Sequence, residues 1–258
     1  MSRAQRKANE KKVKHPLLSR QEREKRKQRV LTKRSPSIVR SIADAIVVKD
    51  EELYFLSERN GRVPLGNTHG FGLYYHDCRY LNGYEVSLAG AEMSPLAATA
   101  ARGYMAILEL TNPDFHASDG RLVEKEEVGI TWRRTIDSGR RMLQDRIAFR
   151  NFGPAEVSFP LTLSFQAEFE DIFSVRGLLP EQPGRLHPPF WKRGLLQFVY
   201  DGNDNLRRSV VIRFSLTPEK KEGAAATFRL KLQPEEKQEL FVSVAVIESA
   251  RESDLDPD

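Results

Sequence analysis

Side chains that could do chemistry are concentrated in the twenty residues from His69 to Leu88, HGFGLYYHDCRYLNGYEVSL. Four of them are potential metal ligands. Their spacing matches no zinc pattern, because the chain has one cysteine and therefore no Cys-x-x-Cys pair. On an extended strand, two of the four would lie on one face and a third on the other. The sequence therefore predicts no metal site and no cofactor here, although the segment holds His69, His76, Asp77 and Cys78.

Cys78 is also a candidate nucleophile, since His76 lies two residues away and could act as its base. A cysteine nucleophile also needs an oxyanion site, and the surrounding sequence marks neither a helix N-terminus nor a backbone nest. We expect a buried thiol instead, beside a pairing of Asp77 with Arg79.

A second acidic cluster lies in QAEFEDIFSVRG, with Glu168, Glu170 and Asp171. Glycosidases use two carboxylates placed on opposite sides of a sugar ring, and neighbours on one strand are poorly placed for that. Two interpretations stay open. The acids pair with Arg176 or cap a loop at a strand end, or they contact a ligand or an adjoining domain.

Aromatic side chains near HPPFWKRG could stack on sugar rings, namely Phe190, Trp191 and Tyr200. The two prolines of this loop suit a docking surface and an ordinary turn equally well.

Alternating apolar and polar residues dominate the chain after about residue 40 and are typical of strands with one buried face. Pro160 interrupts one such segment, residues 157–165, which predicts an edge strand or a bulge there. Residues 53–57 with the turn at 59–62 suggest one hairpin, and residues 123–136 and 141–149 suggest another. Further strands are expected at residues 84–88, 104–110, 210–216, 228–232 and 240–246.

About a dozen strands with no long helix predict an all-β fold, a large antiparallel two-sheet sandwich carrying a disordered basic N-terminal tail. We expect the tail at residues 1–36, the sandwich at residues 37–250 and an acidic C-terminal tail at residues 251–258. Residues 1–35 hold fourteen Lys and Arg and three Glu, a net charge of +11, so the rest of the chain carries (41 − 14) − (36 − 3) = −6.

The basic tail could attach to nucleic acid or another polyanion. It has few apolar residues to order it and no interleaved aromatic residues for base stacking, so nucleic acid is not the expected partner. The single cysteine suits a reducing compartment, and no apolar run is long enough for a membrane helix or a secretory signal. We expect a cytoplasmic protein.

Three segments in this order resemble the N-terminal domain of bacterial glycogen debranching enzyme-like proteins, the amylo-α-1,6-glucosidase group. They are His76-Asp77-Cys78-Arg79-Tyr80-Leu81, then Leu110-Thr111-Asn112-Pro113, then Glu168-Phe169-Glu170-Asp171-Ile172-Phe173-Ser174-Val175-Arg176-Gly177. The chain departs from that family's pattern at Cys78, where Thr is usual, and at Glu168, where Asp is usual.

The resemblance implies a β-sandwich followed by an (α/α) toroid that carries the catalytic carboxylates. Because this sequence ends at DLDPD, we expect a non-catalytic domain that supports a toroid on a partner. We expect Asp77 and Arg79 to leave the core face and contact that partner, with Asp171 and Arg176 on a loop reaching toward its cleft. The alternatives are a stand-alone α-glucan-binding module that uses Trp191, a polyanion-binding tail, and, last, an independent enzyme.

Overall fold

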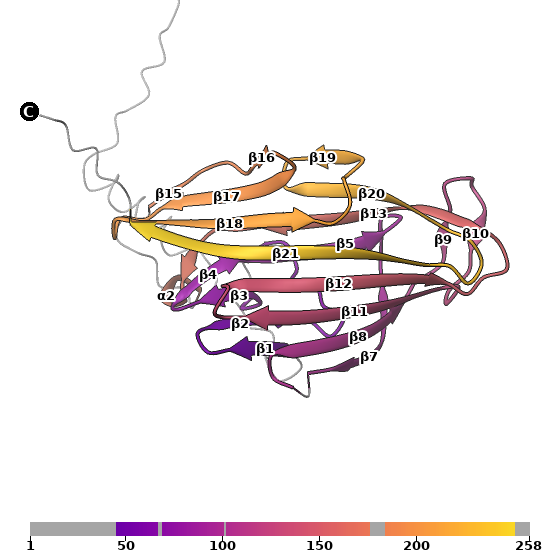
Figure 1. Ribbon diagram of the computed structural model, residues 1–258, viewed down its shortest axis with the longest axis horizontal. Helices are drawn as coiled ribbons and strands as arrows, with labels where there is room; N and C mark the ends of the chain where they lie inside the picture. The colour runs from indigo at the N-terminus through magenta and orange to yellow at the C-terminus, as the bar shows by residue number, and fades with distance from the viewer. Residues whose placement is uncertain (1–44, 67–68, 101, 176–183, 251–258) are drawn as a thin grey trace, which may run out of the picture. The chain divides into compact units, whose positions relative to one another are not determined.

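The computed structural model describes residues 45–66, 69–100, 102–175 and 184–250 (Figure 1). Contacts divide the chain into two units, Met1–Pro36 and Ser37–Asp258, and every described residue belongs to the second. The predictions of a disordered basic tail and of an acidic C-terminal tail fall outside the described residues.

The largest sheet has nine strands, all paired antiparallel (Figure 1). Its long strands carry the alternation that the sequence predicted, with each second residue buried. The order is β15 (Arg185–Leu186), β17 (Leu195–Asp201), β18 (Leu206–Phe214), β21 (Lys237–Ala250), β12 (Met142–Asn151), β11 (Val128–Asp137), β8 (Met105–Thr111) and β7 (Ser94–Thr99), with β16 (Phe190–Lys192) also paired to β17.

Two five-stranded antiparallel sheets form the second layer. The first has the order β1 (Ile46–Asp50), β2 (Leu53–Ser57), β3 (Gly72–Tyr75), β4 (Cys78–Leu81) and β14 (Glu170–Asp171). The second has the order β19 (Lys220–Glu222), β20 (Ala225–Leu232), β13 (Val157–Gln166), β5 (Gly83–Leu88) and β6 (Ala91–Glu92). A small ribbon, β9 (Phe115–His116) with β10 (Leu122–Val123), and the helical turn α2 (Ile172–Val175) complete the described elements.

Aromatic rings join the two layers. Tyr84 of β5 meets Trp132 of β11 edge to face, with ring centroids 5.7 Å apart. Phe159 of β13 lies 6.2 Å from Phe149 of β12. The alternating apolar residues of both layers thus bury one face each against the other, which confirms the all-β two-layer sandwich.

One ion pair is enclosed within this core. Arg134 of β11 donates to both carboxylate oxygens of Asp145 on β12, at 2.9 and 2.8 Å, and also to the Gly61 carbonyl oxygen. Its guanidinium lies 4.2 Å from the ring centroid of Phe55 and 4.6 Å from that of Trp132. Burial of this charge is tolerated because it is both paired and hydrogen-bonded.

Two local predictions were wrong. Pro160 lies in β13, the middle strand of its sheet rather than an edge strand. Pairing with β5 begins at Leu161, so the missing N–H of Pro160 falls where β5 has already turned away, beside Ala89. The turn at residues 59–62 closes no hairpin either. After β2 the chain crosses to the second five-stranded sheet, where Val63 bridges Tyr84 of β5.

Candidate functional site at one end of the sandwich

The hairpin β3–β4 places the His-Asp segment at the end of its sheet. Its turn is made by His76 and Asp77, and His76 adopts a φ of 50°. At the other end of β3, Gly72 has a φ of 141°, and a Cβ there would lie 2.1 Å from the carbonyl oxygen of Leu81. Only glycine permits this close approach, so Gly72 lets β3 and β4 pack together.

The acidic segment forms the next strand beside this hairpin. In β14, Glu170 pairs with Arg79 and Asp171 pairs with Cys78 of β4. The N–H of Ile172, the first residue of α2, donates to the carbonyl oxygen of Asp77 at 2.9 Å. Two of the segments that carry the resemblance are therefore neighbours in space.

Arg79 was expected to leave the core face and contact a partner, but the residue is only 1% exposed and offers no surface to an outside contact. It donates to the carboxylate of Glu170 and to the carbonyl oxygens of His69 and Phe71. Alternation along β4 does direct Arg79 away from the sandwich core. That face is covered by the chain before β3 and by Glu170, and does not meet solvent. The expected pairing of Arg79 with Asp77 is replaced by the pairing with Glu170.

An open cleft of about 460 Å³ lies at this end of the sandwich. Asp77 on its rim is exposed and Asp171 is half-buried. Arg176, which follows α2 closely, lies outside the described residues, so its predicted role as a contact stays a prediction. The cleft is lined by Tyr75, His76, Asp77, Cys78, Phe169, Asp171, Tyr200, Gly202, Asn203, Asp204, Leu206, Arg208 and Glu248.

Three charged residues of the cleft were missed from the sequence: Asp204, Arg208 and Glu248. Arg208 donates to both carboxylate oxygens of Asp204, at 3.2 and 2.6 Å, and these bonds hold the pKa of Asp204 below its ordinary value. The guanidinium of Arg208 also lies 3.2 Å from Glu248, which accepts a hydrogen bond from the Tyr80 hydroxyl at 3.0 Å. The turn sequence DGNDN marked only a turn and gave no sign of the pairing with β21.

Cys78 is the cysteine of this cleft, and it is buried, as predicted. Burial raises the pKa of its thiol to about 12, so the thiol stays protonated near neutral pH. His76 is turned to Glu52, with Nε2 2.7 Å from a carboxylate oxygen. Within the described ranges, no three His, Cys, Asp or Glu side chains converge in a way that could hold a metal ion.

Trp191, the sugar-stacking candidate, lies in β16 at the opposite end of β17 from Tyr200 and the cleft. One face of its indole stacks on Phe214, with centroids 6.1 Å apart, and the ammonium of Lys221 lies 5.1 Å from its centroid. Its Nε1–H donates to the carbonyl oxygen of Gly223. Trp191 is therefore engaged by its own domain, and the structure does not bring it together with Asp77 and Asp171.

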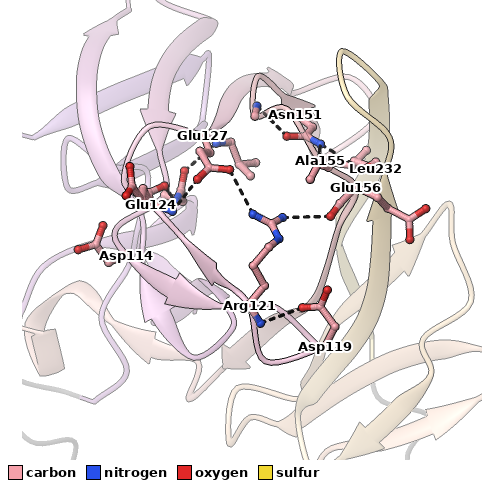
Figure 2. Close-up of polar contacts among 12 residues, drawn as sticks. Asp114, Asp119, Arg121, Glu124, Glu127, Asn151, Ala155, Glu156 and Leu232 are labelled. Atoms are coloured by element: carbon pink, nitrogen blue, oxygen red, sulfur yellow. Dashed lines mark hydrogen bonds and ion pairs between the residues drawn. The ribbon is translucent and has the colours of Figure 1, made fainter.

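The remaining family-like segment, Leu110–Pro113, organises the loops at the far end of β11 and β12 (Figure 1). The buried side chain of Asn112 donates to the carbonyl oxygens of Pro113 and Glu124 and accepts the N–H of Val128. Across the same loops, Arg121 donates to the backbone of Glu156 and lies 3.6 Å from the carboxylate of Glu127, as Figure 2 shows. This segment fixes loop geometry at the end away from the cleft.

These features define an antiparallel β-sandwich domain with a solvent-open cleft at one end. Residues 48–243 match the family described as the N-terminal domain of (some) glycogen debranching enzymes, and the chain belongs to this family. No curated protein sequence matches the chain significantly. The part of the chain that the structure describes contains no helix long and apolar enough to cross a membrane.

A solved structure shares the fold at low sequence identity. A protein assigned as a kojibiose phosphorylase, from the human microbiome, superposes with a TM-score of 0.56 at 10% identity, covering 81% of this chain and 30% of that one. The chain thus spans less than a third of that protein. Two weaker matches are a protein assigned as an aldose 1-epimerase from Escherichia coli K12 (TM-score 0.43, 6% identity, 79% of this chain and 98% of that one) and a galactose mutarotase-like protein from Lactobacillus casei (0.41, 7%, 79% and 100%).

Proposed function

We propose that this domain is non-catalytic and supports an (α/α) toroid glycosidase domain, which docks against the end cleft. The observation that carries the proposal is the meeting of two family-like segments at one open surface, through the pairing of β14 with β4. Asp77 and Asp171 present carboxylates on that surface, with Arg176 following α2 in the sequence. Family membership supports the class of partner.

The chemistry of the cleft favours a supporting role over hydrolysis. A glycosidase needs one carboxyl group with a raised pKa as its acid and a second carboxylate across the sugar. Here Asp204 has a lowered pKa, and Glu248 is engaged by Tyr80 and Arg208. These pairs brace the wall of the cleft, which leaves the rim residue Asp77 for an outside contact.

Two measurements test the proposal. The purified chain is assayed for glucose release from a branched α-glucan, and we expect none. The chain is then titrated with an isolated toroid domain of a debranching enzyme by calorimetry, and we expect binding that the double variant Asp77→Arg, Asp171→Arg abolishes. The matched control is Asp119→Arg, Glu222→Arg, which makes the same charge change away from the cleft and should bind normally.

Thermal unfolding of both double variants should match that of the parent chain, which separates loss of docking from loss of fold. Glucose release by the chain alone would overturn the non-catalytic assignment. Binding unaffected by the cleft variant would overturn the docking surface. Titration with α-glucan oligosaccharides tests the alternative of a glucan-binding module, and saturable binding without any toroid would favour that alternative.

A further inference from the structure

A second hollow lies on the outer face of the nine-stranded sheet, away from the sandwich core. It has a volume of about 430 Å³ and is lined from four adjacent strands, β11, β12, β21 and β18. Its outward side chains follow from the strand register, because residues directly opposite each other share a face. Arg133 pairs with Arg146, Arg146 with Phe241, and Ser243 with Arg213. We call this hollow the outer-face groove.

Two cations of the groove have no counterion among the described residues. Arg133 and Arg213 are both exposed, and in the described part of the chain no carboxylate lies within ion-pair distance of either. Arg146 between them is bonded to Glu239 at 2.8 and 2.7 Å, and Lys237 lies 3.0 Å from the same carboxylate. The carboxylate of Glu239 is therefore already neutralised, and the groove is locally positive on a body whose net charge is negative.

The spacing of the two arginines suits one small anion. Their strands are three apart, about 14 Å at the usual ~4.8 Å spacing, and Arg213 lies two residues, about 7 Å, further along the strand direction, since it faces Ser243 and not Phe241. Long side chains reaching inward from both sides can meet at a single group over β12 and β21. Guanidinium groups bind phosphoryl oxygens through paired N–H donors, so an ester phosphate matches this arrangement.

The floor of the groove suits a hydroxylated ring. Phe241 is 49% exposed, and the guanidinium of Arg146 lies over its ring, 5.8 Å from the centroid, which leaves part of the ring open to a ligand. Thr135, Gln144 and Ser243 supply hydroxyl and amide groups around it. Aromatic faces stack on the C–H side of sugar rings while such polar groups bond their hydroxyls.

We propose that the outer-face groove binds a phosphorylated sugar, with Arg133 and Arg213 on the phosphoryl group and Phe241 under the ring. The ligand is a free hexose phosphate or a phosphoryl group carried on a glucan chain. This site shares no residue with the end cleft, so the proposal stands independently of the toroid-docking function.

The test is calorimetric titration of the whole chain at low salt with four separate probes: glucose 6-phosphate, phosphorylated amylopectin fragments, glucose and inorganic phosphate. We expect saturable binding of a phosphorylated probe that is stronger than binding of glucose or of phosphate. Preference for glucose 6-phosphate indicates a free sugar phosphate, and preference for the amylopectin fragments indicates a polymer.

Variants locate the binding. Arg133→Gln and Arg213→Gln should each weaken it about tenfold, since a hydrogen bond to a charged group contributes roughly that much. Phe241→Ala should weaken the phosphorylated sugar while leaving inorganic phosphate unchanged. Arg185→Gln, an exposed arginine on β15 outside the groove, is the matched control and should bind normally.

Equal weakening by Arg185→Gln, equal affinity for inorganic phosphate and glucose 6-phosphate, or absence of binding at millimolar concentrations would each overturn the site. Because all four variants are exposed on strands, unchanged thermal unfolding is expected and is measured alongside.

Discussion

Replacing Arg79 by Met should destabilise the domain by about 3–5 kcal/mol, the usual cost of removing one partner from a buried ion pair. The side chain of Arg79 is 0% exposed and that of Glu170 is 14% exposed, so water screens the pair poorly. The substitution leaves a carboxylate without its cation. It also leaves the carbonyl oxygens of His69 and Phe71 without the donor that Arg79 provides. For a domain of this size the loss corresponds to a fall in Tm of about 10 °C.

Calorimetry and urea unfolding of Arg79→Met measure this loss, with Arg146→Met as the control. Arg146 also makes a two-bond pair, with Glu239, but its side chain is 47% exposed. The control should therefore cost less than about 1 kcal/mol. Adding Glu170→Met to Arg79→Met should restore part of the stability, because the unpaired carboxylate is then gone. If Arg79→Met and Arg146→Met lowered the Tm equally, the reasoning that burial decides the value of the pair would be refuted.

Three further predictions concern the same region. Gly72→Ala should lower the free energy of unfolding in urea by about 3 kcal/mol or more, because its Cβ would meet the Leu81 carbonyl. The control Gly90→Ala, with φ +82° and nothing within 4 Å of its Cβ, should lower it by about 1–2 kcal/mol. Equal losses would contradict the close approach. Hydrogen bonds from Arg207 and His187 hold the pKa of Asp201 below its ordinary value, so the stability they provide is present at neutral pH and is lost as the pH falls below about 4. Asp201→Asn should therefore be less stable than the parent at pH 7 and nearly equal to it in strong acid, and a gap independent of pH would exclude this linkage. Finally, iodoacetamide at pH 8 should modify Cys78 far more slowly in the folded chain than in urea, because its thiol pKa is about 12, and similar rates would show that the thiol is accessible.

The strands were predictable because alternation records which face of a segment is buried. β2 matches the predicted residues 53–57, and β11 with β12 forms the hairpin expected around Asp137. The way strands assemble into sheets was not predictable. The turn at 59–62 looks like a hairpin turn, yet the chain changes sheets there, and Trp132 packs so close to Gly61 that a Cβ at that position would lie 3.1 Å from the indole ring.

Only some of the cleft residues could be predicted, for a similar reason. Asp77 and Asp171 were found through short segments that resemble a family, and local sequence places each at a strand end. Arg208 and Glu248 come to the cleft through the pairing of β18 with β21, where the two residues lie directly opposite each other. A register between strands forty residues apart leaves no local signal, so these residues were missed.

The His69–Leu88 segment shows why residue types that suit chemistry do not by themselves mark a reaction centre. His69 accepts the N–H of Phe71 at Nδ1 and lies 2.6 Å from the Pro64 carbonyl at Nε2, so its proton belongs on Nε2. Arg79 and Cys78 are likewise enclosed, the first by backbone carbonyls and Glu170 and the second by burial. His69 and Arg79 have their bonding capacity engaged in shaping the loop before β3 and the junction with β14, and Cys78 is buried. We therefore propose that the functional contact falls to Asp77, an exposed residue of the turn, and a variant there should alter docking without altering the stability that its neighbours provide.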